Sequence, residues 1–433
     1  MVNKKRFVAF LMVATLCVTN VFAQYSIGNN FSPYTMYGIG EMFVPGDAAS
    51  KSMGGIGLAS RSRISPNAQN PAAFSAMIEK SALFSVGIQA NNNFLSDKGL
   101  SSSHNNLQLS NVNLQFRVAK GIGFGFSLSP YSNSGYRVKI QETDPEIISS
   151  VGDVAYNHYG KGGISNMKFG FGFALTNNLS IGVNYMYMLG TIDRKYVSQI
   201  NPYISPYDYR SIYDEKSLLV NQSTFELGAQ YRFKIEESKS ITIGAVYQPS
   251  FKTKAPVTHF VESSYGKIVD TIRYAKYKTS VKCPSKYAIG FLYTTPKIRM
   301  GLDYVYRNFD NLMPDYVETD RVTYAGSHDV KFGLEYIPNR FDIRSNLKRW
   351  TYRLGAKYSR SYYRYDNKPL DEIAVTLGFG VPLQKNGFTQ LNIGAEVGRQ
   401  GLETGQISNT YFKVFGGVNF VSIGSWFKRR KFK

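Results

Sequence analysis

Residues 298–307 read Ile-Arg-Met-Gly-Leu-Asp-Tyr-Val-Tyr-Arg. Apolar residues alternate with charged residues or glycine, and this period of two is the signature of a β-strand with one apolar face. One face of the predicted strand carries Ile298, Met300, Leu302, Tyr304 and Tyr306. The opposite face carries Arg299, Gly301, Asp303 and Arg307.

The same alternation recurs along most of the chain, and it predicts fourteen strands. Their approximate ranges are 80–95, 105–119, 122–142, 164–176, 178–198, 218–235, 239–262, 267–295, 297–310, 324–338, 349–362, 371–383, 388–400 and 407–420. An even number of strands is typical of single-chain bacterial outer-membrane barrels.

Periodicity alone does not distinguish a transmembrane barrel from a soluble β-sandwich, because both have strands with one apolar face. Three features favour the barrel. The apolar faces are long and unbroken, Tyr and Phe gather near strand ends, and short turns alternate with long connections, as periplasmic turns and extracellular loops do. We therefore expect an all-β, 14-stranded antiparallel transmembrane barrel over residues 80–420.

The first residues resemble a secretory signal peptide. Lys4, Lys5 and Arg6 precede a short apolar run, and Val21-Phe22-Ala23 offers a cleavage site after Ala23. The run is too short for a membrane-spanning helix. A lipoprotein is the alternative because of Cys17, but Leu16 before it is large for a lipidation site. We expect a signal peptide at residues 1–23.

Composition narrows the choice of partners. The formal net charge of +21 falls to +18 without Lys4, Lys5 and Arg6. A secreted chain rarely meets nucleic acid, so we expect membrane lipids and lipopolysaccharide as neighbours of the excess cations, or simply solvated barrel rims. Only Cys283 remains after cleavage, which excludes an internal disulfide and a cysteine-based metal site.

Two irregularities interrupt the alternation. The apolar phase slips between Leu109 and Val112, which indicates a bulge in the second strand. In the third strand the pattern breaks over residues 129–135, Ser-Pro-Tyr-Ser-Asn-Ser-Gly, and resumes at Tyr136. Proline cannot donate to a β-ladder, so the break predicts a kink or a gap in the wall. An ordinary early turn is the alternative.

Residues 24–79 alternate poorly and contain the Gly-rich stretch Met53-Gly54-Gly55-Ile56-Gly57 and, later, Asn70-Pro71-Ala72. No Gly-Lys-Ser/Thr follows the glycines, which argues against a phosphate-binding loop. A segment of this length before a barrel can fill the lumen, and inward glycines in the strands would leave room for it. We expect a hatch at residues 24–79.

This mature N-terminus, followed by fourteen strands, resembles the FadL/TodX outer-membrane transport family, in its Bacteroidetes variant. The resemblance rests on Ser52-Met53-Gly54-Gly55 with Gly57 and Ala59, on Asn70-Pro71-Ala72, and on Phe420 followed by the basic, aromatic residues 426–432. It implies a hatch motif and lateral exit of hydrophobic molecules through a kinked third strand. The implied hatch residues are Gly54, Gly55, Gly57, Asn70, Pro71 and Ala72. The implied lateral opening is formed by Pro130, Ser132, Asn133 and Gly135.

The resemblance implies passive uptake of small, fatty-acid-like hydrophobic compounds at the cell outer membrane. The predicted lumen face is charged, however, which does not suit an apolar ligand. The alternative is therefore a non-transporting barrel subunit of an outer-membrane secretion or assembly complex, with outer-membrane proteins as partners. We expect no enzyme activity, cofactor or metal site, because the sequence has no Gly-x-Ser-x-Gly elbow and its four histidines lack metal-ligand spacing. Residues 421–433 are expected to form a basic periplasmic tail.

Overall fold

The computed structural model describes residues 32–79, 81–97, 99–200, 209–265, 268–310, 312, 321–384, 389–403 and 407–423. The expected signal peptide and most of the expected C-terminal tail lie outside these residues. The described helices include none that is long and apolar enough to cross a membrane.

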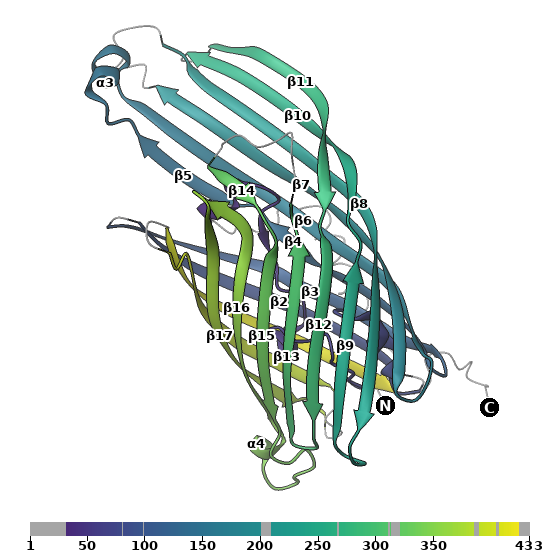
Figure 1. Ribbon diagram of the computed structural model, residues 1–433. Coiled ribbons are helices and arrows are strands. Elements are labelled where there is room, and N and C mark those ends of the chain that lie inside the picture. Colours follow the sequence, from purple (N-terminus) through teal and green to yellow (C-terminus); the bar gives the residue numbers. More distant parts are fainter. Residues whose placement is uncertain are drawn as a thin grey trace, which may run out of the picture.

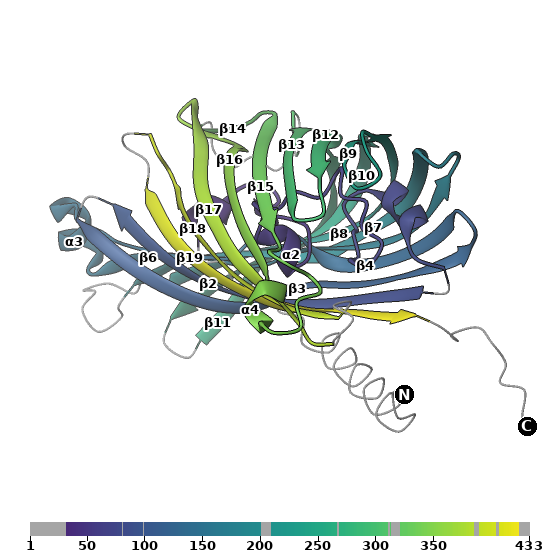
Figure 2. The same ribbon diagram turned by 90° about the horizontal axis from the view of Figure 1, so that it is seen from below.

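The chain forms a closed antiparallel barrel of fourteen strands (Figures 1 and 2). The last strand pairs with the first, from Ser408↔Ser96 to Ile423↔Ser81, so the sheet closes. Closure leaves the main wall of the barrel without open edges. The strands of the first half are β2 (Ser81–Asp97), β3 (Leu100–Ala119), β4 (Ile122–Asn133), β5 (Tyr136–Gln141), β6 (Val154–Ala174), β7 (Leu179–Ile200) and β8 (Ser211–Lys234).

Four of the fourteen strands are divided into two pieces each: β4 with β5, β9 with β10, β11 with β12, and β14 with β15. The remaining strands are β9 (Ser240–Gln248), β10 (Phe251–Tyr265), β11 (Ile268–Cys283), β12 (Ser285–Thr294), β13 (Ile298–Asn308), β14 (Val322–Tyr324), β15 (Ser327–Tyr336), β16 (Thr351–Tyr365), β17 (Lys368–Pro382), β18 (Gln390–Gln400) and β19 (Ser408–Ile423). The predicted fold class is thus confirmed, and most predicted boundaries differ from the structure by only a few residues.

Several predicted boundaries differ from the structure, and β3 begins at Leu100 rather than near 105. β6 begins at Val154 rather than near 164, and β8 begins at Ser211 rather than near 218. These early residues pair fully with β7, although their glycines and charges blur the alternation. The barrel also runs to Ile423, three residues into the expected tail.

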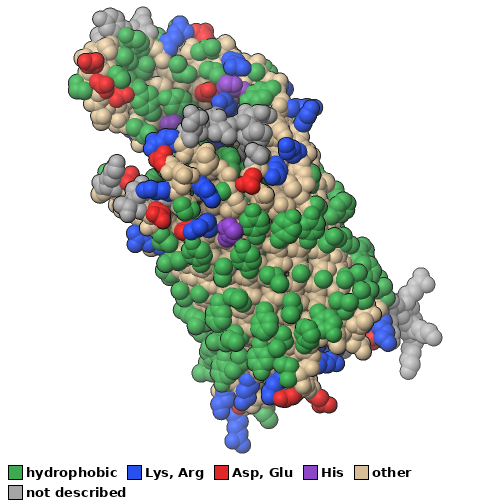
Figure 3. Space-filling model, in the orientation of Figure 1, with side chains coloured by type: hydrophobic (Ala, Val, Ile, Leu, Met, Phe, Trp, Pro, Cys, Tyr) green, Lys and Arg blue, Asp and Glu red, His purple; other side chains and the backbone are tan. Residues whose placement is uncertain are grey.

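The alternating faces separate as the pattern predicts. Leu302 and Tyr304 are exposed on the outside of β13, whereas Asp303 is 2% exposed and faces inward. Hydrophobic side chains form a broad band over the lower part of the visible face, and charged side chains gather above and below it (Figure 3). This is the arrangement of a barrel wall that faces lipid.

The N-terminal segment lies inside the barrel and contains only short elements (Figure 2). These are η1 (Pro33–Met36), β1 (Glu41–Met42), α2 (Ala48–Lys51) and η2 (Pro71–Ala76). Asp47 caps α2 by accepting a hydrogen bond from the Ser50 backbone N–H at 2.9 Å. Two further short helices lie in connections between strands: α3 (Pro145–Val151) and α4 (Asn346–Arg349).

Candidate functional site

The predicted hatch residue Asn70 is completely buried and joins three parts of the molecule. Its Nδ2 donates to the carbonyls of Leu58 at 2.8 Å and Ala229 at 3.2 Å, and its Oδ1 accepts from the Ala72 backbone N–H at 3.1 Å. Asn70 therefore starts the 3₁₀ helix η2 and ties it both to the Gly-rich stretch and to strand β8.

The Gly-rich stretch turns sharply against the wall. Gly54 and Gly55 have φ of +68° and +86°, which side chains other than glycine rarely adopt. The Gly54 N–H donates to Thr376 Oγ1 at 2.9 Å. The N–H groups of Gly57 and Leu58 both donate to Asp303 Oδ2, at 2.7 and 2.9 Å. The wall thus binds the hatch backbone at several points.

Glycines on the inner face of the barrel allow this close approach. A Cβ added to Gly182 would lie 2.4 Å from the backbone carbon of Pro71, and one added to Gly244 would lie 2.1 Å from the Leu58 carbonyl oxygen. The predicted hatch residues Gly54, Gly57, Asn70, Pro71 and Ala72 thus lie against the wall, whereas Gly55 packs against Val44 within the hatch.

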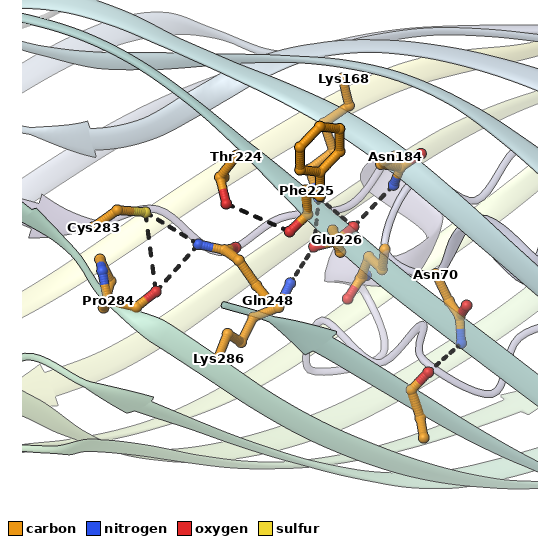
Figure 4. A network of polar contacts seen from close by, with 12 residues as sticks. Asn70, Lys168, Asn184, Thr224, Phe225, Glu226, Gln248, Cys283, Pro284 and Lys286 are labelled. Atoms are coloured by element: carbon orange, nitrogen blue, oxygen red, sulfur yellow. Dashed lines mark hydrogen bonds and ion pairs between the residues drawn. The ribbon is translucent and has the colours of Figure 1, made fainter. Parts of the chain in front are cut away.

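Ion pairs fill the lumen beside and above the hatch. Glu226, fully buried, contacts the Nζ atoms of Lys168 and Lys286 and accepts from Asn184 at 2.9 Å (Figure 4). In two more clusters a central charged side chain also contacts two side chains of opposite charge. Glu335 bonds Arg299 and Arg353, and Lys357 bonds Glu372 and Glu396. These clusters connect neighbouring strands and neutralise the inward charges that the sequence places there.

Lys51 of the hatch is also buried. Its Nζ donates to Gln89 Oε1 and Ser110 Oγ, both at 2.7 Å, and lies 4.0 Å from the centre of the Phe43 ring. Burial lowers the pKa of this amine to about 7. Ser110 is the extra residue of a bulge in β3, so the bulge predicted between Leu109 and Val112 is confirmed.

The predicted break in the third strand lies between β4 and β5. Both pieces pair with β6, so the break is an interruption within one strand and not an early turn. The pairing of β4 with β6 is bulged between Pro130 and Ser132. Its pairing with β3 runs only from Val112↔Leu128 to Ala119↔Ile122. The upper part of β3 and strand β5 therefore separate beside the break.

Hatch residues cover this break from inside. β1 pairs with it through Glu41↔Asn133 and Met42↔Ser132. The Phe43 N–H donates to the Tyr131 carbonyl, and the Ser32 N–H donates to the Gly135 carbonyl, both at 3.0 Å. Sequence reasoning missed this covering strand. The only signal for it is the short apolar run of residues 42–44 before Pro45.

The four residues predicted for the lateral opening, Pro130, Ser132, Asn133 and Gly135, are brought together and are all buried. Asn133 bridges to β3 by donating to Gln108 Oε1 at 3.0 Å. The spaces beside them are small. A cavity of about 90 Å³ adjoins Asn133 and is lined mostly by polar and charged residues, and one of about 60 Å³ adjoins Pro130. Among the described residues, no group of three His, Cys, Asp or Glu side chains can hold a metal ion.

The fold of this chain is similar to that of solved transporters for hydrophobic compounds. The structure is similar to a FadL homologue of Pseudomonas aeruginosa (TM-score 0.59, 13% identity, covering 88% of this chain and 99% of that one). It is also similar to the toluene transporters TbuX of Ralstonia pickettii (0.57, 15%, 87% and 98%) and TodX of Pseudomonas putida (0.58, 12%, 88% and 99%). At these identities the likeness shows the fold alone.

The family is shown by the sequence itself. The model of the BamG family matches residues 1–433, so this chain belongs to the BamG family. No curated protein matches it. The FadL/TodX resemblance of the sequence is therefore confirmed at the level of the fold, while the family is a different one.

Proposed function

We propose that this chain is a non-transporting barrel subunit of an outer-membrane protein secretion or assembly complex. The observation that carries the proposal is the attachment of the hatch to the barrel wall. Asp303 accepts two hatch N–H groups, Thr376 accepts a third, and Asn70 donates to the wall. Buried hydrogen bonds of this kind are costly to break without replacement. A hatch held in this way closes the lumen.

The cavities beside the third-strand break, among the described residues, also do not suit an apolar ligand. Sites for small molecules are mostly apolar and typically enclose roughly 300–1,000 Å³. The two cavities beside the third-strand break measure about 90 and 60 Å³, and Lys168, Lys286 and Arg307 line the second. The proposal accordingly assigns the chain no catalytic role and no cofactor.

Family membership supports the same choice. The model that spans the whole chain is named BamG and not for a transporter. The similar transporters share only 12–15% of their residues with this chain. Partner proteins in the outer membrane are thus the ligands that we propose for this barrel.

Passive uptake of small hydrophobic compounds is the second candidate, and one observation favours it. β4 loses its pairing with β3 beyond Leu128, beside Pro130, where a lateral opening was predicted. In this candidate Pro130, Ser132, Asn133 and Gly135 would line the exit once β1 has moved away. The chain's inner ion pairs would then border the path of the compound.

Gentle detergent extraction of the tagged chain from its native membrane tests the proposal, with co-purified proteins and small molecules identified by mass spectrometry. We expect partner proteins in fixed stoichiometry and no bound hydrophobic compound. A solitary barrel with a lipid-like compound in its lumen would contradict the proposal. Uptake that changes in Pro130→Ala or Gly135→Ala variants, but not in a Gly416→Ala control, would favour the second candidate.

A further inference from the structure

The outward face of the β10–β11 hairpin carries a ladder of lysines. Their neighbours Ala255, Val257 and Val281 are at most 2% exposed and face inward, so the lysine side chains point away from the lumen. Lys282 lies opposite Lys252 in the register, and the other outward lysines face uncharged residues: Lys254 faces Ser280, Lys278 faces Pro256 and Lys276 faces Thr258. The lysine ladder consists of Lys252, Lys254, Lys276, Lys278 and Lys282, of which all but Lys282 are exposed.

The lysine ladder has no counter-ions of its own. None of the five forms an ion pair with any described residue, and Lys282 Nζ donates only to the Asp310 carbonyl, at 2.7 Å. The β11 carboxylate Asp270 is ion-paired with Arg210. Side chains directly opposite in an antiparallel pair have Cβ atoms roughly 5 Å apart, and like charges there are destabilising. The Lys252–Lys282 rung therefore favours a bound anion.

The ladder lies immediately above the aromatic residues at the upper edge of the apolar band. Tyr247 lies near the end of β9, Tyr287 lies near the start of β12, and their ring centres are 5.2 Å apart. Both are exposed, as is Tyr304 beside them. Aromatic girdles mark the boundary between hydrocarbon and headgroups. The lysines therefore lie at the level of the outer-leaflet headgroups.

An apolar groove runs down the outer wall below the ladder. It is lined by Leu227, Ala229, Ala245, Tyr247, Tyr287 and Ile289 and has a volume of about 490 Å³. The alanines make it hollow, because the residues around them are larger. Lys252 follows Tyr247 by only five residues, at most about 17 Å along the chain, so the ladder and the upper end of the groove are neighbours.

We propose that the lysine ladder and the apolar groove together form a binding site for a phosphorylated, multiply acylated lipid of the lipid A type. Its phosphates bind the lysines, and one acyl chain lies in the groove. Lysine is a compact point charge that binds phosphate through several donors. A second copy of this chain would bring lysines against lysines and is disfavoured. The site is independent of whether the barrel transports compounds or binds proteins.

Native mass spectrometry of the full chain in detergent tests the site. The probes are diphosphoryl lipid A, the same lipid without phosphates, and pyrophosphate as a competitor. Replacing Lys252, Lys254 and Lys278 with Gln is expected to weaken diphosphoryl lipid A binding at least about tenfold, since each surface lysine contributes appreciably to anionic lipid binding. Ala245→Leu, which fills the groove, is expected to weaken it severalfold while leaving the ladder intact.

The matched control replaces Lys234, Lys297 and Lys348, at the opposite end of the barrel, with Gln and removes the same charge. This control is expected to bind like the wild type. Equal loss in the control and ladder variants would overturn the site, as would equal binding of the lipid without phosphates. Competition by pyrophosphate at the same concentration as lipid A would show a free-phosphate site and also overturn the proposal. The Ala245→Leu variant and a Lys252→Gln single variant keep the test decisive if the triple variant does not fold.

Discussion

Glu226 illustrates how single residues make this lumen polar and closed. It is fully buried between Lys168 and Lys286 and comes from the inner face of β8. The sequence places the charge of Glu226 on the inward face of β8. Its partners, however, come from other strands of the barrel. A buried charge is tolerable only when partners surround it in this way.

Replacing Glu226 with Gln is expected to destabilise the barrel by roughly 3–5 kcal/mol, because two buried ammonium groups lose their common counter-ion. The change in stability is measured from the temperature at which the band of folded protein disappears in a heat-modifiability gel. The matched control is Glu236→Gln, which breaks an exposed pair with Lys239 and should cost less than about 1 kcal/mol. Similar shifts in the two variants would show that the buried cluster stabilises the barrel no more than the exposed pair does.

At the scale of elements, glycines on the inner face of the wall allow the hatch to pack closely against it. Gly182 of β7 faces Pro71 of η2, and Gly355 of β16 faces Gly54. Their alternation with apolar residues is visible in the sequence, whereas the hatch segment that each one meets is not. A side chain at such a position collides with hatch backbone, which cannot move aside as a flexible side chain can.

Gly182→Ala is therefore expected to displace η2 from the wall, because the new Cβ would lie 2.4 Å from Pro71 and 2.6 Å from the Ala72 nitrogen. Displacement is measured as faster tryptic cleavage in the hatch, at Lys51 and Arg61, in folded protein. Gly416→Ala is the matched control, since its Cβ would meet only the Asn392 carbonyl oxygen at 3.9 Å. Unchanged cleavage in Gly182→Ala would mean that the hatch does not press on the wall.

At the scale of the whole molecule, a closed fourteen-strand wall surrounds the N-terminal segment. Residues of the wall hold this segment in place. The barrel interior would otherwise be wide enough for water and ions. β1 covers the third-strand break, and buried ion-pair clusters join neighbouring strands inside the barrel. We therefore expect the closing of the lumen to depend on the N-terminal segment.

The full chain in a planar lipid bilayer is expected to conduct no measurable ion current, whereas a variant lacking residues 32–76 should form an open, less stable pore. The measurement is single-channel conductance at equal protein insertion. Steady conductance of the full chain would contradict a closed hatch. Absence of conductance in a folded deletion variant would show that the lumen is closed by the strands alone.

Alternation along the strands was sufficient to predict the fold class, the strand count and the bulge beside Leu109. It also located the third-strand interruption, because proline and glycine disturb a ladder locally. It underestimated β6 and β8, whose upper parts mix apolar residues with glycines and charges and so lack a clean alternation. There the strand is held by pairing with β7, which the sequence does not reveal.

The sequence by itself determined which residues share a face of each strand, since a strand's side chains alternate whatever its neighbours are. Only the tertiary structure decided which inward residues meet. Barrel closure and register place Glu226 between two lysines, Asp303 beneath the Gly-rich stretch, and β1 across the break at Pro130. These contacts join residues separated by dozens to hundreds of positions, and no local pattern encodes such distances. The chemistry of the wall is therefore local, whereas the closing of the lumen is a property of the assembled barrel.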